Sequence, residues 1–115
     1  MYLGKKKIYN SSKNKMLDIN ISDQIEKYTE LGAGEILINN VSREGSLKGF
    51  DFSILELLKD KINVPIIVNG GINSYRQINE ILKKDNIDAV GVGAFFIYYG
   101  PHNAVLISYI PNDQR

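Results

Sequence analysis

Polar and glycine residues at the ends of three short apolar segments are the residues of this chain best suited to hold a ligand. The segments end in Asn39-Asn40, Asn69-Gly70-Gly71 and Gly93-Ala94. Glycine lets backbone N–H groups approach an anion closely, and the start of a helix adds unpaired donors and a partial positive charge. We therefore predict that Gly70, Gly71, Gly93 and Ala94 bind a phosphate group. The alternative is that the glycines only form tight turns.

Two further side chains could take part in chemistry. Glu44, in the polar segment Ser42-Arg43-Glu44-Gly45, could act as a general acid or base, unless the loop is simply solvated. His102 is the single histidine, and we expect it to be structural because no nucleophile or clustered ligand accompanies it. The chain has no cysteine, which excludes a thiol nucleophile, a disulfide and a cysteine-ligated zinc site. We expect no metal, and no dinucleotide-binding or Walker fingerprint is present.

The composition is that of an ordinary globular protein with a balanced charge. Of the 115 residues, 43% are hydrophobic and 23% are charged, and the 14 basic and 13 acidic residues leave a net charge of +1. This balance gives no reason to expect nucleic acid or an anionic membrane as a partner. The one basic cluster, Lys5 to Lys7 with Lys13 and Lys15, is interpreted as a solvated face. Without a signal-peptide core or a membrane-spanning apolar run, the chain is predicted to be cytoplasmic.

The elements that must position these residues alternate between strands and helices. Apolar spacing, caps and turn residues first predict a hairpin of residues 6–9 and 15–18, and then a helix 21–31 that is capped by Asn20 and closed by Gly32. Three strands follow, at residues 35–39, 64–68 and 88–92, and two helices connect them: one is capped by Asp51 and reaches about residue 62, and the other runs from Ser74 to about residue 84. A helical turn 95–98 and an extended segment 104–109 complete the prediction.

This order predicts an α/β fold with parallel strands. The strands are continuous apolar runs, as expected of parallel strands buried on both faces. Two architectures fit: part of a (β/α)₈ barrel, or a small open doubly wound sheet. The length is short for a complete barrel, which typically needs about 250 residues. We expect one domain, residues 1–115, composed of a hairpin (1–18), βα units (19–100) and a tail (101–115).

Four ordered blocks of this sequence resemble the C-terminal half of the cyclase subunit of imidazole glycerol phosphate synthase. The blocks are Gly32-Ala-Gly-Glu-Ile-Leu-Ile38, Val41-Ser-Arg-Glu-Gly45 with Gly49-Phe-Asp51, Val64-Pro-Ile-Ile-Val-Asn-Gly-Gly71 and Asp88-Ala-Val-Gly-Val-Gly93. The resemblance covers nearly the whole chain and implies a partial TIM barrel that holds strands six, seven and eight.

The resemblance also implies an activity and a set of roles. The family enzyme receives ammonia from a glutaminase partner and cyclises a phosphorylated aminoimidazole ribonucleotide without a metal or organic cofactor. Gly70, Gly71, Gly93 and Ala94 match its second phosphate grip. Asn39 and Asn69 match polar strand ends that contact substrate, and Glu44 lies in a substrate-facing loop. Glu35 matches a charged residue at the ammonia entrance. The two catalytic aspartates of the family belong to strands one and five, so we expect no catalytic residue among these 115.

Two departures from the family pattern leave the function open. Ser42 and Glu44 stand where the family usually has aspartate, which puts the role of their loop in doubt. The segment 100–109 resembles paralogues from bacterial surface-sugar clusters, which work with a glutaminase and a sugar amidotransferase. Three hypotheses remain. The chain is part of a cyclase or ammonia-channelling subunit and is inactive alone, or it is a phosphate-binding or assembly module that self-associates through open strand edges. The third hypothesis is a non-functional fragment.

Overall fold

A computed structural model of the chain describes residues 7–58, 62–84, 87–99, 101–102, 104–105 and 113. The chain divides into two compact units, each made of two stretches of sequence. The first unit combines Met1–Ile36 with Phe52–Val64, and the second combines Leu37–Asp51 with Pro65–Arg115. All the residues predicted to bind phosphate belong to the second unit.

The first unit begins with the predicted hairpin. Strands β1 (Ile8–Asn10) and β2 (Lys15–Leu17) pair antiparallel, and Asn14 takes up a left-handed conformation with φ of +48° in the turn between them. The hairpin prediction is confirmed, although its first strand lies one to two residues further along the chain than expected. Lys7, Lys13 and Lys15 are exposed, while Lys5 and Lys6 lie outside the described residues.

Helix α1 (Ile21–Glu30) begins and ends as its sequence predicts. The Asn20 side chain accepts a hydrogen bond of 2.8 Å from the backbone amide of Ser22, so one of the unpaired donors at the start of the helix is satisfied. Gly32 adopts φ of +102° just beyond the end and donates its amide to the carbonyl of Thr29 at 3.0 Å. That geometry is the left-handed helix ending for which glycine is favoured.

Helix α2 (Ser53–Leu57) is shorter than predicted within the described residues. Its N-cap is Phe52 rather than the expected Asp51, and Phe52 provides no side-chain cap. The amide of Leu58 bonds the carbonyl of Leu55 at 3.2 Å, a three-residue spacing that tightens and closes the last turn. The rest of the predicted helix, residues 59–61, lies outside the described part of the chain.

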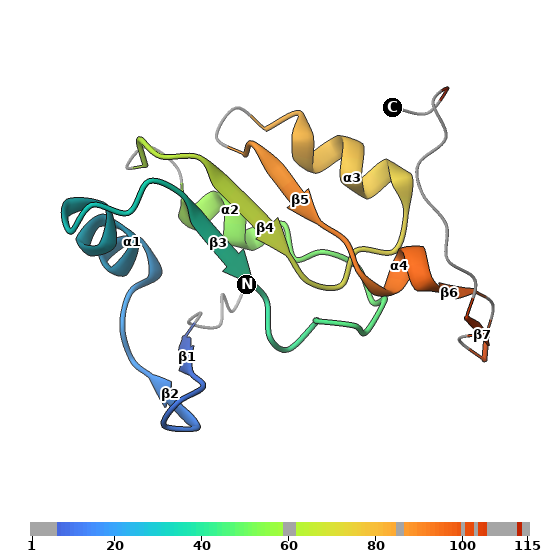
Figure 1. The fold of residues 1–115 in the computed structure, drawn as a ribbon, viewed down its shortest axis with the longest axis horizontal. Helices are drawn as coiled ribbons and strands as arrows, with labels where there is room; N and C mark the ends of the chain where they lie inside the picture. The colour runs from blue at the N-terminus through green and yellow to red at the C-terminus, as the bar shows by residue number, and fades with distance from the viewer. Residues whose placement is uncertain are drawn as a thin grey trace. The chain divides into compact units, whose positions relative to one another are not determined.

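The second unit contains a sheet of three parallel strands, which confirms the predicted α/β class (Figure 1). Strands β3 (Ile36–Asn39), β4 (Ile66–Asn69) and β5 (Ala89–Gly91) lie in the order β3-β4-β5. Val68 pairs with Val90, and Asn69 pairs with Gly91. Because the strands are parallel, their carboxyl ends meet at one edge of the sheet, where the candidate residues lie.

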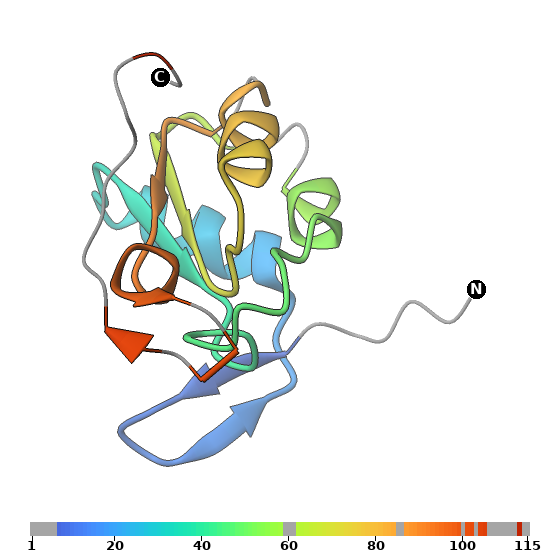
Figure 2. The same cartoon turned by 90° about the vertical axis from the view of Figure 1, so that its right-hand side faces the viewer.

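Helix α3 (Tyr75–Leu82) packs along the sheet of the second unit (Figure 2). Ser74 caps it by accepting a hydrogen bond of 3.2 Å from the amide of Gln77. The helical spacing of Ile78, Ile81 and Leu82 predicts that all three side chains face inward. Ile78 and Ile81 are buried, but Leu82 is 46% exposed. Leu82 is the last residue of the helix and lies at the flank of the buried stripe, so its predicted inward position is wrong.

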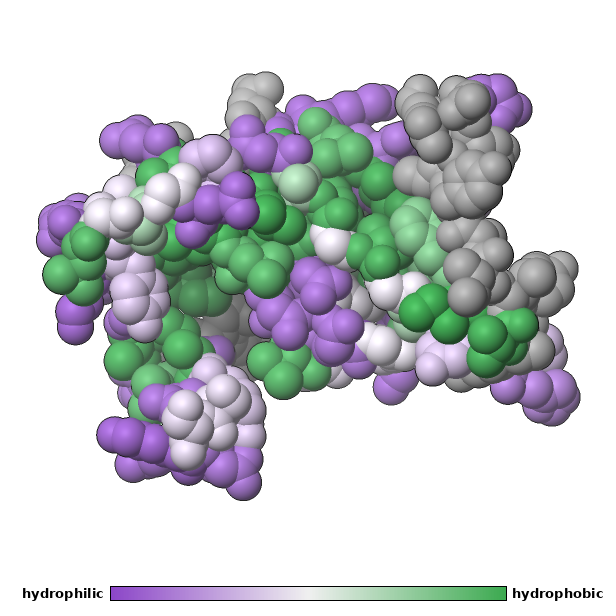
Figure 3. All heavy atoms as spheres, in the orientation of Figure 1, coloured by the Kyte–Doolittle hydropathy of each residue, from purple (hydrophilic) through white to green (hydrophobic). Residues whose placement is uncertain are grey.

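The face of the sheet against α3 holds the core of this unit. Ile66 and Val68 are fully buried in β4, whereas Leu37 in β3 is 61% exposed. Burial therefore alternates along β3 and β4 but not along β5, and the expectation of strands buried on both faces is not met by β3. Viewed from the side of Figure 1, hydrophobic atoms cover much of the sheet, and a hydrophilic patch interrupts them beside the ends of β3 and β4 (Figure 3).

The chain after β5 forms a short helix and a small hairpin. Helix α4 (Ala94–Ile97) is followed by β6 (Tyr98–Tyr99), which pairs antiparallel with β7 (Ala104–Val105). The predicted helical turn is confirmed, except that Tyr98 belongs to a strand. The predicted extended segment begins as β7, and its residues 106–109 lie outside the described residues.

Candidate functional site

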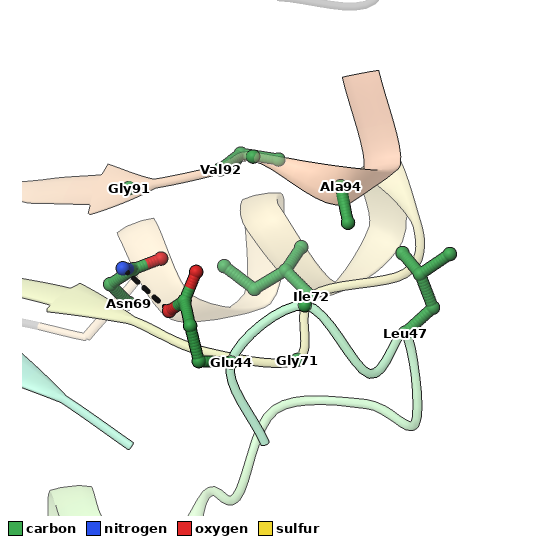
Figure 4. Close-up of a pocket in the computed structure, with 10 residues that line it drawn as sticks. Glu44, Leu47, Asn69, Gly71, Ile72, Gly91, Val92 and Ala94 are labelled. Carbon is green, nitrogen blue, oxygen red and sulfur yellow. Dashed lines mark hydrogen bonds between the residues drawn. The ribbon is translucent and has the colours of Figure 1, made fainter. Parts of the chain in front are cut away.

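A small pocket lies in the second unit at the carboxyl ends of β4 and β5 (Figure 4). Gly71 and Ile72 line it after β4, Gly93 and Ala94 line it after β5, and Glu44 reaches it from the loop after β3. The space inside amounts to about 10 Å³, which is about the room that one water molecule needs. The structure therefore brings together the strand ends that the sequence singles out.

Backbone amides are the main donors of this pocket. Within the described part of the chain, the amides of Gly71, Ile72, Gly93 and Ala94 donate no hydrogen bond to the protein. Unpaired N–H groups retain their need for an acceptor. The two loops therefore bring four residues whose amides have no acceptor among the described residues to the lining of one pocket.

Gly70 and Gly71 also shape the turn after β4. Gly71 has φ of +81°, and a Cβ atom there would lie 2.5 Å from the carbonyl oxygen of Gly49. Gly70 has φ of +123°, and its Cβ atom would lie 2.9 Å from the carbonyl oxygen of Asn40. Both positions require glycine for the close approach of two loops, so the tight-turn reading of these residues has a steric basis. Gly71 lines the pocket, whereas Gly70 does not.

Gly93 and Ala94 form the wall of the pocket opposite the loops. Gly93 is the N-cap residue of α4, and no atom lies within 4 Å of the position its Cβ would take. Packing therefore does not demand glycine at 93.

The three residues predicted to contact substrate form one hydrogen-bonded cluster. The Nδ2 group of Asn69 donates to Oε2 of Glu44 at 2.9 Å and to Oδ1 of Asn39 at 3.2 Å. The Asn69 side chain also lies against Gly91, where a Cβ atom would be 3.2 Å from its Cβ and Cγ atoms. Figure 4 shows the Glu44 carboxylate turned toward Asn69 at the pocket.

The loop that carries Glu44 is held by backbone contacts at both ends. The Asn40 carbonyl accepts the Glu44 amide at 2.9 Å, and the Asn40 side chain accepts the Ser42 hydroxyl at 2.8 Å. At the far end, the Gly49 amide donates to the Gly71 carbonyl at 2.7 Å. The loop is therefore held at both ends, while the Glu44 side chain itself is exposed. The acid–base role and the solvated loop both stay predictions.

Leu47 and Ile72 line the pocket and Asn73 holds one of its loops, and none of these three was predicted from the sequence. Leu47 lines the pocket with φ of +56°, a conformation that is uncommon for a bulky residue. The Nδ2 group of Asn73 donates to the Leu47 carbonyl at 3.0 Å and so ties the loop after β4 to the loop after β3. Asn73 lies two residues beyond the glycine pair Gly70-Gly71. A polar side chain so close to the end of β4 could have indicated that it belongs to the site.

The remaining candidates lie away from the pocket. Glu35 is exposed and directly precedes β3, at the opposite end of that strand from Asn39. His102 is exposed in a turn. Over residues 7–58, 62–84, 87–99 and the short described stretches beyond, no group of three His, Asp or Glu side chains could hold a metal ion. In the same residues, no helix is long and apolar enough to cross a membrane.

Comparison with known proteins identifies the family. Residues 3–103 match the model of the histidine biosynthesis protein family. The chain belongs to this family. Proteins of this family are TIM barrels, so part of a barrel is the correct one of the two predicted architectures. The consecutive strand order β3-β4-β5 agrees with it.

Individual members of the histidine biosynthesis family are similar over most of this chain. A protein of Leptospira interrogans, provisionally named imidazole glycerol phosphate synthase subunit HisF, is 36% identical over 93% of the chain. A Leptospira borgpetersenii protein of the same provisional name is 37% identical over 80% of the chain. A Pseudomonas aeruginosa protein, provisionally named subunit hisF2, is 39% identical over 70%. The matches cover 41%, 36% and 32% of these relatives, so the chain spans well under half of their length.

Proposed function

We propose that this chain binds the phosphate group of a small substrate, as the second phosphate site of a cyclase-like subunit related to imidazole glycerol phosphate synthase. The observation that supports this most is the set of four backbone amides around one pocket at the ends of β4 and β5. The family membership and the match of Gly70, Gly71, Gly93 and Ala94 to the family's phosphate grip point to the same ligand.

The chemistry of the pocket suits binding by dipoles rather than by charge. The residues that line it include no lysine or arginine, so the attraction for an anion comes from backbone N–H groups. Hydrogen bonds to a charged oxygen are shorter and stronger than those between neutral groups. Gly70 supports this arrangement indirectly, because its conformation allows the chain to turn back toward the loop that carries Glu44.

Asn39, Asn69 and Glu44 form the part of the site that we assign to the carbon skeleton of the ligand. The cluster offers a carboxylate and two amide groups at the edge of the pocket. Glu44 is the one side chain there that could transfer a proton, and we propose it as a substrate contact. The acid and base of the family's cyclisation reaction would come from strands outside these 115 residues.

The partners follow from the family and are part of the proposal. A cyclase-like subunit would receive ammonia from a glutaminase, and Glu35 would then lie at the ammonia entrance, because it precedes β3 at the end away from the phosphate site. The alternative product is an amidated surface sugar. The sequence of residues 100–109 favours that alternative, although most of this segment lies outside the described residues.

Removal of one backbone donor tests the proposed site. Ala94→Pro deletes the amide at the first position of α4, where proline is well tolerated. Gly93 before it, with ψ of −85°, would have to turn toward the extended conformation that proline favours. Loss of one hydrogen bond to a charged oxygen is worth about 1.5–3 kcal/mol, so the affinity for glycerol 3-phosphate should fall at least tenfold. Ala94→Gly, which keeps the amide, is the matched control.

Nuclear magnetic resonance of the labelled chain is the appropriate measurement. Titration with glycerol 3-phosphate should move the backbone amide signals of Gly71, Ile72, Gly93 and Ala94 in the wild type and in Ala94→Gly. A ligand that shifts none of these signals, or that binds Ala94→Pro as tightly as Ala94→Gly, would contradict the proposed site.

A further inference from the structure

Arg43 lies in the loop that borders the pocket, but its side chain has no part in the proposed site. The guanidinium is half-buried, and its Nη1 group donates a hydrogen bond of 2.9 Å to the carbonyl oxygen of Gly49, a buried residue. Among the described residues, no other group donates to this carbonyl. Because a buried carbonyl without a donor is costly, the guanidinium holds Gly49 in place.

The contact between Arg43 and Gly49 closes the loop after β3 upon itself. The segment between these two residues supplies Glu44, Gly45 and Leu47 to the lining of the pocket, and Figure 4 shows Glu44 and Leu47 on this loop. Arg43 itself does not line the pocket. Its side chain therefore holds one side of the pocket from behind.

Gly49 passes this restraint on to the loop after β4. Its amide donates to the Gly71 carbonyl at 2.7 Å, and that carbonyl shares one planar peptide group with the amide of Ile72. The peptide is trans, so its C=O and N–H groups point in opposite directions. The Ile72 amide is therefore turned away from Gly49. The hydrogen bond that the group accepts also polarises it, which strengthens its N–H as a donor.

We propose that Arg43 is a positioning residue of the pocket, which aims the Ile72 amide at the bound phosphate by way of Gly49. This inference rests on the proposed phosphate site. Hydrogen bonds weaken steeply as their angle departs from linear, so a small rotation of the peptide between Gly71 and Ile72 would weaken the contact with the anion. The guanidinium prevents that rotation without touching the ligand.

The test removes the guanidinium and keeps much of its aliphatic stem. The labelled 115-residue chain, Arg43→Met and Arg43→Lys are titrated with glycerol 3-phosphate, and the amide signals of Gly71 and Ala94 report binding. Arg43→Met should bind about tenfold more weakly, which corresponds to one hydrogen bond to a charged oxygen. Arg43→Lys keeps a charged donor for the Gly49 carbonyl and should restore most of the affinity.

Lys48→Met is the matched control for charge, because it removes one positive charge from an exposed position of the same loop. It should leave the affinity unchanged. Equal losses in Lys48→Met and Arg43→Met would overturn the inference, since charge alone would then explain both. A folded Arg43→Lys that has lost the affinity would also overturn it, and this variant decides the question if Arg43→Met does not fold.

Hydrogen exchange of the free proteins separates a loosened loop from a destabilised fold. In Arg43→Met the Gly49 amide should exchange faster than in the wild type. The Asp88 amide, bonded to the Ile66 carbonyl at 2.9 Å where β4 begins, should exchange as before. Equal acceleration at both amides would contradict a positioning role.

The titration also separates the two proposals. If glycerol 3-phosphate shifts Gly71 and Ala94 in the wild type and binds Arg43→Met as tightly, the positioning role is overturned and the phosphate site stands. If it shifts neither signal in the wild type, the proposed function itself fails.

Discussion

Replacement of Gly71 by alanine should destabilise the fold far more than the same change at another glycine of similar conformation. Gly71 has φ of +81°, and the new Cβ would lie 2.5 Å from the Gly49 carbonyl oxygen and 3.0 Å from the Arg43 Cβ. One neighbour is a backbone atom and the other is bonded directly to the backbone, so neither can move away by a change of side-chain rotamer. The clash can be relieved only if the turn itself moves. That movement would also weaken the 2.7 Å hydrogen bond from the Gly49 amide to the Gly71 carbonyl.

The magnitude follows from three contributions to the free energy of unfolding. A left-handed conformation costs an L-residue about 1–2 kcal/mol. Loss of the backbone hydrogen bond costs about 1 kcal/mol, and displacement of the packed neighbours adds about 1–2 kcal/mol. The total, about 3–5 kcal/mol, is a large part of the 5–15 kcal/mol typical of small domains. Gly45→Ala is the matched control, because φ is +70° there and no atom lies within 4 Å of the added carbon.

Urea unfolding followed by circular dichroism measures the difference. The wild type and both variants are fitted with a common dependence on denaturant, so that the midpoints report stability. Gly45→Ala should lose only the conformational cost of about 1–2 kcal/mol. Equal losses in the two variants would refute the steric argument, since they would show that the Gly49–Gly71 turn yields freely.

Two further predictions concern the elements that hold the site. Ile81→Ala, at a fully buried position of α3, should lower the free energy of unfolding by about 2–5 kcal/mol. Leu82→Ala should lower it much less, because that side chain is half-exposed. If the two variants unfold at similar midpoints in urea, the difference in burial does not decide their stability. Asn20→Ala removes the side-chain cap of α1 and should lower the free energy of unfolding by about 1 kcal/mol. Asn20→Ser should keep most of that stability, because serine also caps helices. Calorimetry of both variants measures the difference, and equal losses would argue against the cap.

The parts of the fold that depend on neighbouring residues were predictable from the sequence. Asn20 and Ser74 cap helices through hydrogen bonds that span two or three residues, and Gly32 ends α1 through its own conformation. Such effects are decided within one turn of the chain. The parallel strands followed from their apolar runs and spacing, and the strand ends placed Gly71, Gly93 and Ala94 at one edge of the sheet.

The errors and omissions concern contacts between distant residues. Leu82 follows the buried Ile78 by four residues and so shares its side of α3. Whether Leu82 is buried depends on how far the neighbouring part of the protein extends over the end of the helix. Asn69 and Glu44 are 25 residues apart, and their hydrogen bond depends on how two loops fold back on each other. The conformation of Leu47 follows from the same loop closure, and its residue type gives no hint of it.

The contact between Asn69 and Gly91 has an evolutionary consequence. The asparagine occupies the volume that a side chain at 91 would fill, since a Cβ atom there would lie 3.2 Å from it. The two positions are therefore expected to show epistasis. A larger residue should become acceptable at 91 only after 69 has become smaller, and a library that varies either position alone would miss the combinations that work.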